Sequence, residues 1–345
     1  MNPFSGGRAF LFLSFAALSA AAQPLATPAE HLRPPEQTYL TFPEWFLVFS
    51  PAEYAEFLRK HPPNEFPFMG HTRQFWQGYG AVWAETGDRY PVNIGYHVMV
   101  SVIGVSTTVE YGLKSWYEKL VGRLSLLTHG KEMTAEDKLA AEVAQEYVDF
   151  IRVDPWYKYD FGKRLGEVWT DTGFWGPHPL RKWERKYALT TEFAAKAIYA
   201  WLIGKATKIG YQEPRPVTAV VAANLPEEAI LEAGNMEIMR KDPETRSALV
   251  LLPRYQAFTT EALSLAKQGV EFAEIAGNRD EILISVIAPV SWSPDNPQNR
   301  VVLRQPILTQ PGKERYVLSL PIVALAENLR KLMAVHVEIE HIYDF

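Results

Sequence analysis

The sequence predicts an α+β protein of two domains. An all-α, aromatic-rich helical domain (residues 38–213) precedes a ferredoxin-like α+β sandwich (residues 214–345). Three observations lead to this prediction. Apolar side chains recur at helical spacing in the first range and alternate with a period of two in much of the second. The aromatic residues concentrate in the first range. A chain of 345 residues also exceeds the usual size of one domain, about 100–200 residues.

The amino terminus resembles a secretion signal. Arg8 precedes the apolar run Phe10–Ala22, which ends in small residues. A short basic start, an apolar centre of this length and an A-x-A ending predict that residues 1–22 are a signal peptide cleaved before Gln23. An uncleaved membrane anchor is the alternative. Residues 23–37 contain four prolines and are expected to form an extended linker. We therefore expect an exported protein, periplasmic or tethered to the envelope membrane.

Composition excludes several kinds of chemistry. The formal net charge is −5, which gives no argument for nucleic acid as a partner. The absence of cysteine removes thiolate nucleophiles, redox pairs and thiolate metal sites. No dinucleotide, phosphate-loop, zincin or serine-hydrolase motif occurs, so we expect no cofactor and no metal.

Helix signals dominate the first range. Capping boxes at residues 41–44 and 50–53 predict two helix starts, and a broad apolar face predicts a helix over residues 71–86. Thr134 is expected to cap a helix that ends before Asp154-Pro155. Residues 181–209 are one long helix or two that meet at residues 190–191.

The segment Tyr90–Arg123 (YPVNIGYHVMVSVIGVSTTVEYGLKSWYEKLVGR) is the most apolar part of the chain after its amino terminus, with no charged side chain between Arg89 and Glu110. It carries two helical stripes. Large apolar residues form one: Ile94, Val98, Val102, Val105, Val109, Leu113, Trp116, Leu120 and Leu124. Small or polar residues form the other: His97, Ser101, Gly104, Thr108, Gly112 and Ser115. A central core helix is favoured over a helix in or on a membrane, and residues 194–206 are its expected partner.

Three stretches carry a resemblance. TFPEWFLVFSPAEYAEFL (41–58), RYPVNIGYHVMVSVIGVSTTVEYGLKSWYEKLVGR (89–123) and WGPHPLRKWERKYALTTEFAAKAIYAWLIG (175–204) are similar to stretches that occur together in a family of uncharacterised bacterial proteins. The resemblance covers roughly residues 38–210. It implies a bacterial origin and carries over no functional residues.

The second range reads as strands with two helices. Strands are expected at 247–253, 271–276, 281–288, 300–308, 315–320 and 335–343, with helices at 258–268 and after Pro321. Gly277-Asn278 and residues 310–312 are expected turns. Without the additional hairpin strands, this order matches the βαββαβ pattern of a ferredoxin-like sandwich, a fold that does not decide function.

Three polar residues of the helical range are candidate ligand-binding or acid–base groups. Glu110 interrupts the apolar helix, and an ion pair with Lys114 one turn later is favoured over a free buried acid. His97 lies on the small-residue stripe and is expected to be a hydrogen-bonded core histidine. His71 is expected near a helix cap or at the surface.

Two further stretches of the chain carry patterns of charged residues. Arg181, Lys182, Arg185 and Lys186, with Trp183 beside them, indicate contact with an anionic membrane surface, although a solvated helix face is favoured. His336, Glu338 and Glu340 share one face of the last strand, where a solvated face is favoured over a metal site.

The sequence therefore favours a non-catalytic envelope protein that binds an apolar or amphipathic ligand, a membrane surface or a protein partner. An enzyme using His97, Glu110 or His71 for acid–base chemistry is the alternative, and it requires these side chains to share one pocket. A multi-pass membrane protein is a third possibility.

Overall fold

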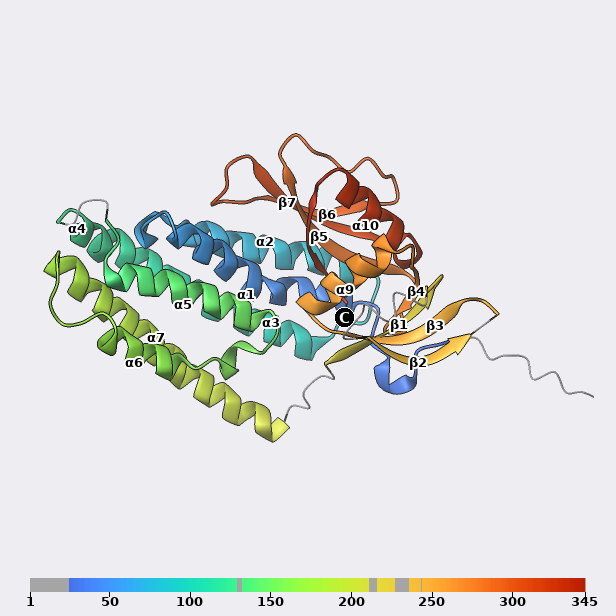
Figure 1. Ribbon diagram of the computed structural model, residues 1–345, viewed down its shortest axis with the longest axis horizontal. Coiled ribbons are helices and arrows are strands. Elements are labelled where there is room, and N and C mark those ends of the chain that lie inside the picture. The colour runs from blue at the N-terminus through green and yellow to red at the C-terminus, as the bar shows by residue number, and fades with distance from the viewer. Residues whose placement is uncertain (1–24, 129–131, 211–215, 227–235, 243, 345) are drawn as a thin grey trace, which may run out of the picture.

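The computed structural model describes residues 25–128, 132–210, 216–226, 236–242 and 244–344. It is a mixed α+β protein, with most of the helices in the amino-terminal half and the strands, with two further α-helices, in the carboxy-terminal half (Figure 1). The predicted signal peptide, residues 1–22, lies outside the described residues. The main helices of the first half are α1 (Gln37–Leu58), α2 (Phe68–Thr86), α3 (Ile94–Tyr117), α4 (Arg123–Leu126), α5 (Ala135–Ile151), α6 (Phe161–Thr170) and α7 (Pro179–Gly210).

Helix α1 runs unbroken through both predicted capping boxes, so the two helix starts expected there are wrong. It contains Pro43 and Pro51 in its interior, where each removes a backbone donor. The Thr41 hydroxyl donates to the carbonyls of Gln37 and Thr38 instead of capping a new helix. Most α1 side chains are buried against α2, α5 and the β-sheet, and this packing offsets the weakened backbone.

Helix α3 packs along the side that carries its small stripe, where Gly104 and Ser115 are buried beside Val100 and Tyr111, and it exposes the stripe of large apolar residues. This is the reverse of the expected core helix. A β-carbon added at Gly104 would lie 2.3 Å from the ring of Phe75, so no larger residue fits beside α2. The nine large apolar residues of the other stripe, from Ile94 to Leu124, are between 49% and 72% exposed. We call them the exposed α3 stripe. Among the helices in the described part of the chain, none has the length and apolar character needed to cross a membrane.

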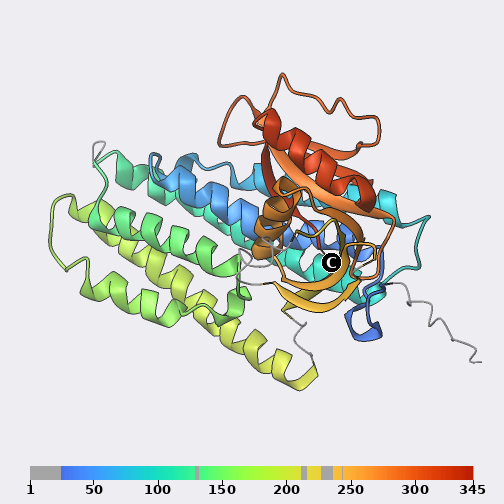
Figure 2. The same cartoon turned by 45° about the vertical axis from the view of Figure 1, so that its right-hand side comes forward.

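The second helical group is α5, α6 and α7. Thr134 and Asp137 form the predicted cap of α5, each side chain bonding the other's backbone N–H. Helix α7 continues through Thr190 and Thr191, so the single-helix alternative is confirmed. Both views place α5, α6 and α7 on the side of α1 away from the β5–β7 strands (Figure 1 and Figure 2).

The carboxy-terminal half holds two four-stranded antiparallel sheets. Their elements are β1 (Val217–Ala223), β2 (Glu237–Asp242), β3 (Ser247–Pro253), α9 (Gln256–Lys267), β4 (Glu271–Ile275), β5 (Glu281–Pro289), β6 (Arg300–Pro306), β7 (Lys313–Pro321), α10 (Leu325–Ala334) and β8 (Glu338–Ile342). The ferredoxin-like sandwich is not confirmed, because β4 and β5 join different sheets across the Gly277 turn. Strands β1 and β2 were not anticipated.

The two sheets repeat one topology. Strand order is β2-β3-β1-β4 in the first and β6-β7-β5-β8 in the second, and each sheet has one helix between its third and fourth strands. Register shifts fall in corresponding pairs, β1 with β4 and β5 with β8, then β2 with β3 and β6 with β7. The inner faces of both sheets share one core with α9 and α10.

A second core joins the two halves of the chain. It combines aromatic residues of α1 and α2 with Leu283, Val317 and Tyr343 from the outer face of the β5–β8 sheet. Strand β5 is therefore buried on both faces, which explains its nearly continuous apolar sequence. The α1–α3 group thus rests directly on a sheet.

Residues 25–36 pack on the first sheet instead of forming the expected free linker. The Thr27 backbone N–H donates to the buried Glu274 carboxylate at 2.8 Å. Leu25 packs against the outer faces of β1 and β3, and Leu32 lies against Gly277.

A candidate ligand-binding cavity among the helices

A cavity of about 1300 Å³ lies among α1, α3, α5 and α7. Ligand pockets usually measure about 300–1000 Å³, so this one has room for a ligand with a long apolar part. Its walls are mainly aliphatic and aromatic: Leu58, Phe68, Ile103, Val143, Tyr147, Phe161, Leu189 and Phe193 are among them. Part of the exposed α3 stripe, including Val109, Leu113 and Trp116, borders the same space.

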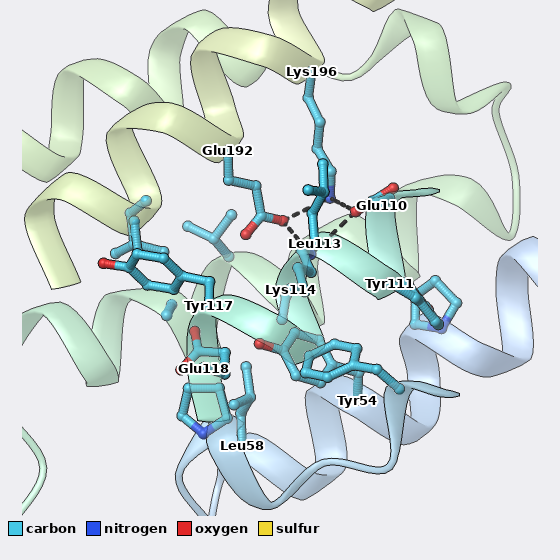
Figure 3. A pocket seen from close by; sticks show the side chains of 18 of the residues that line it. Tyr54, Leu58, Glu110, Tyr111, Leu113, Lys114, Tyr117, Glu118, Glu192 and Lys196 are labelled. Atoms are coloured by element: carbon cyan, nitrogen blue, oxygen red, sulfur yellow. Dashed lines mark hydrogen bonds and ion pairs between the residues drawn. The ribbon is translucent and has the colours of Figure 1, made fainter. Parts of the chain in front are cut away.

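Four charged side chains meet inside this cavity (Figure 3). Helix α3 supplies Glu110 and Lys114, and α7 supplies Glu192 and Lys196, each pair one helical turn apart. The Lys114 ammonium lies 3.1 Å from Glu110 and 2.8 Å from Glu192. The Lys196 ammonium lies 3.4 Å from Glu110 and 2.7 Å from Glu192. We call these four residues the cavity tetrad.

All four members of the tetrad are charged at neutral pH. Burial alone would raise the carboxyl pKa values, but the two lysines outweigh it and hold the pKa values of Glu110 and Glu192 below their ordinary range. Burial would lower the lysine pKa values, but the two glutamates raise those of Lys114 and Lys196. Two positive and two negative charges give the tetrad a net charge of zero.

The tetrad faces the open space of the cavity. The Glu110 side chain is 42% exposed, compared with 24% for Glu192 and Lys196 and 19% for Lys114. Aromatic rings flank the two ammonium groups: Tyr54 lies 5.5 Å from Lys114, and Tyr147 lies 5.5 Å from Lys196. A charged cluster that water and ligands can reach is thus set in an apolar wall.

The predicted Glu110–Lys114 ion pair is confirmed, but its partners on α7 were missed. Glu192 and Lys196 have the same Glu-to-Lys spacing on a segment expected to lie near α3. That shared spacing was the feature of the sequence that could have predicted the pairing of the two helices through these charges.

His71 lies at the start of α2, near the helix cap as expected, but it is buried in a hydrogen-bonded network, so the surface alternative is wrong. The Ser50 hydroxyl lies 3.0 Å from His71 Nδ1 and 2.8 Å from the Tyr111 hydroxyl. His71 Nε2 lies 3.5 Å from Oε2 of Glu53, and the other carboxylate oxygen of Glu53, Oε1, accepts a hydrogen bond from Arg315 on β7 at 2.9 Å. Burial lowers the pKa of His71 to about 3, so the imidazole is neutral.

This network resembles a serine–histidine–acid arrangement but does not open to a reacting group. Ser50 is 0% exposed, and neither it nor His71 lines the cavity. Tyr111 is the member that does. The network connects α1, α2 and α3 to the β-sheet.

His97 lies far from the tetrad. Its Nδ1 is 3.0 Å from the Tyr79 hydroxyl, and its ring packs against Trp83 beside a small hollow of about 10 Å³. Thirteen residues of α3 separate it from Glu110, or roughly 20 Å at 1.5 Å per residue. The enzyme alternative requires His97, Glu110 and His71 to share one pocket. The structure does not bring them together.

The charged residues at the start of α7 are buried, contrary to both expectations for them. Arg181, Lys182, Arg185 and Lys186 are each at most 4% exposed. Glutamates and aspartates of other helices neutralise them: Lys182 lies 2.7 Å from Glu136, and Arg185 donates to Glu118 at 2.8 Å. Trp183 is 40% exposed. These charges have protein partners and present no basic surface.

The solvated face expected at the last strand is confirmed for His336 and Glu338, which are exposed, but not for Glu340. Glu340 accepts hydrogen bonds from the buried Arg315 guanidinium at 2.7 Å, so it is not a solvated residue. Across the residues with described positions, no three His, Cys, Asp or Glu side chains gather as a metal site would require.

No family model, curated protein or solved structure matches this chain.

Proposed function

We propose that the protein binds an amphipathic small molecule in the cavity among α1, α3, α5 and α7. One observation carries the proposal: a cavity of about 1300 Å³ with apolar walls contains a fully ionised tetrad. The walls suit an apolar chain, and the tetrad suits a polar end. The signal-like amino terminus supports a place for this activity in the bacterial cell envelope.

The charge states in the cavity favour binding over catalysis. A general acid or base works best with a pKa near the operating pH. The pKa values of the tetrad carboxyl groups are lowered and those of the tetrad lysines are raised. None of the four groups is therefore ready to exchange a proton at neutral pH. His71, neutral and enclosed, gives no alternative base at this site.

The first test is native mass spectrometry of the purified protein, followed by identification of any lipid or small molecule that it retains. The amino-terminal mass from the same sample shows whether the chain is cleaved before Gln23. A fluorescent single-chain lipid then gives an affinity. If the protein retains no amphiphile and binds none at micromolar concentration, the proposal fails.

A cavity-filling variant locates the binding. Ala195 on α7 is exposed and lines the cavity, so Ala195→Trp places an indole in the space without disturbing the core. We expect lipid binding to weaken at least tenfold. Ala84→Trp is the matched control, because Ala84 is an exposed helical alanine of α2 outside the cavity wall. Equal affinities for the two variants would place the lipid elsewhere.

A second candidate function is docking on a membrane surface through the exposed α3 stripe. The nine large apolar side chains, seven on α3 and two on the helical turns that follow it, make an unusually long apolar surface. Ile198, Trp201 and Leu202 on α7 are also at least half exposed. The basic start of α7 does not support this candidate, because its charges are buried and paired. Docking would therefore depend on apolar insertion and little on anionic lipid.

Vesicle flotation separates this candidate from cavity binding. We expect wild-type protein to float with neutral and anionic vesicles alike, and Val105→Asp to abolish flotation. Val323→Asp is the control, since Val323 is similarly exposed in the sheet half, 62% against 56% for Val105. Flotation unaffected by Val105→Asp, or no flotation at all, would eliminate this candidate.

A further inference from the structure

The two carboxylates of the tetrad are not equivalent. Glu192 lies within 2.8 Å of both ammonium groups, whereas Glu110 lies 3.1 Å from Lys114 and 3.4 Å from Lys196. Glu110 is also the most exposed of the four, at 42%. Glu192 therefore holds the lysines in place, and Glu110 is the member that a ligand meets first.

Each side of the tetrad retains capacity for a ligand. The shortest contacts of Glu110 with both lysines are made by the same oxygen, Oε1, so Oε2 is the oxygen that lies farther from each ammonium group. Each ammonium has three N–H donors, and the two carboxylates engage two of them. A cationic group of a ligand can approach Glu110 Oε2, while an anionic group accepts from Lys196 or Lys114.

The net charge of zero decides between classes of ligand. Other charges of the wall are paired with each other, Arg181 with Asp137 and Arg185 with Glu118. A headgroup with charge of one sign only would therefore leave an unbalanced charge beside the tetrad, which is unfavourable. A headgroup that carries both charges leaves the balance unchanged. The rings of Tyr54, Tyr147 and Phe161, which already face the lysine ammonium groups, offer the aromatic faces that alkylated ammonium groups prefer.

We infer that the cavity tetrad recognises a zwitterionic headgroup, an ammonium and a phosphate or carboxylate joined by a short linker, at the end of a single apolar chain. The inference rests on the proposed function, since it assigns the headgroup to the tetrad and the chain to the apolar walls. The ammonium pairs with Glu110 and the anionic group with Lys196.

Calorimetric titration with five twelve-carbon amphiphiles below their micelle concentrations tests this. The series is dodecylphosphocholine, dodecyl betaine, dodecyl phosphate, dodecyltrimethylammonium and dodecyl maltoside. We expect wild-type protein to bind at least one zwitterion about tenfold more tightly than dodecyl phosphate or dodecyltrimethylammonium, whose headgroups carry charge of one sign only. One charge-assisted hydrogen bond produces a difference of this size. Preference between phosphocholine and betaine identifies the anionic group as phosphate or carboxylate.

Two charge-neutralising variants provide an independent measurement. Glu110→Gln makes the tetrad +1, so we expect dodecyl phosphate to become the preferred amphiphile. Lys196→Gln makes it −1, so we expect dodecyltrimethylammonium to gain instead. Lys331→Gln is the control, because it breaks an exposed pair with Glu327 on α10, far from the cavity wall, and it is expected to leave the wild-type ranking unchanged.

The outcomes separate the two claims. If none of the five amphiphiles binds, the proposed function fails. If wild-type protein binds all five with equal affinity, or if the ranking is the same in the wild type and both tetrad variants, the proposed function stands and the zwitterion inference is overturned. The wild-type series decides even if a variant does not fold.

Discussion

Helix α7 takes part in two clusters of charged residues. Each cluster contains both lysine and glutamate side chains, but the two have different environments. At its start, Lys182 and Lys186 converge on Glu136, which is 0% exposed, and also donate to the carbonyls of Thr172 and Val168. Further along the helix, Glu192 and Lys196 join the cavity tetrad. The first cluster is enclosed by protein, and the second faces open space.

The difference indicates separate roles for similar residues. An enclosed ion pair fixes the geometry of its helices, because removing one partner leaves an uncompensated buried charge. A partly exposed pair contributes little to stability but can exchange partners with a ligand. The comparison therefore assigns structure to the Glu136 cluster and recognition to the tetrad.

Removing Lys182 should give the largest effect on stability. Lys182→Ala leaves the buried Glu136 with only Lys186, whose ammonium is 3.6 Å away. We expect the free energy of unfolding to fall by about 3–5 kcal/mol, measured by urea denaturation. Glu110→Gln is the matched change in the tetrad and should cost less than about 1 kcal/mol. Similar losses for both variants would show that the two clusters have the same role.

Acid should lower the stability first through two buried histidines where helices meet the sheet, and not through either charged cluster. Burial lowers the pKa values of His71 and His341 to about 3, below the ordinary value of 6.5. The unfolded chain therefore binds more protons than the native protein between those values. Stability should fall as pH drops from 6.5 towards 3, by up to about 1.4 kcal/mol per pH unit for each histidine.

Urea denaturation at several pH values measures this slope. His71→Asn preserves an acceptor or donor near the Ser50 hydroxyl but removes the titration, and we expect a shallower slope. His61→Asn on the surface is the control, since the His61 side chain is 51% exposed. If both His71→Asn and His341→Asn leave the slope unchanged, the acid sensitivity belongs to the carboxylates.

A substitution that displaces α3 from α2 should give the smallest of the three losses in stability. Gly104→Ala introduces a β-carbon 2.3 Å from Phe75, so we expect a loss of about 1–3 kcal/mol and weaker ligand binding as Glu110 and Lys114 move. Gly112→Ala is the matched control. A β-carbon there meets nothing within 4 Å, and replacing glycine in a helix interior should stabilise it by about 0.5–1 kcal/mol. Loss at both positions would mean that helix α3 tolerates no change on this side.

The sequence predicted local structure better than partners. Strand β3 and the Thr134 cap were predicted because alternation and capping chemistry are properties of neighbouring residues. The stripes of α3 were also correct, but a stripe does not say which side packs. Here the aromatic rings of α2 leave room only for Gly104 and its small neighbours.

Long-range pairing explains the other errors. The counter-charges of Lys182 and Arg181 come from Glu136 and Asp137, more than 40 residues away, so the basic run read as a surface. The ferredoxin-like arrangement is not confirmed, and the prediction did not include the strand Val217–Ala223. That strand pairs with β3 and β4 and makes a second sheet necessary. The tetrad was half predicted, because Glu110 and Lys114 are neighbours on one helix while the other half is on α7.

Arg315 has a consequence for how the molecule unfolds. It is 1% exposed and binds both Glu53 of α1 and Glu340 of β8. These contacts lie beside the second core, which joins the helices to the β5–β8 sheet and buries Tyr343. Heat should therefore melt helices and sheets in a single calorimetric transition. A ligand bound among the helices should raise the midpoint temperature of that single transition. The unfolding of the strands would then shift to higher temperature although they do not contact the ligand.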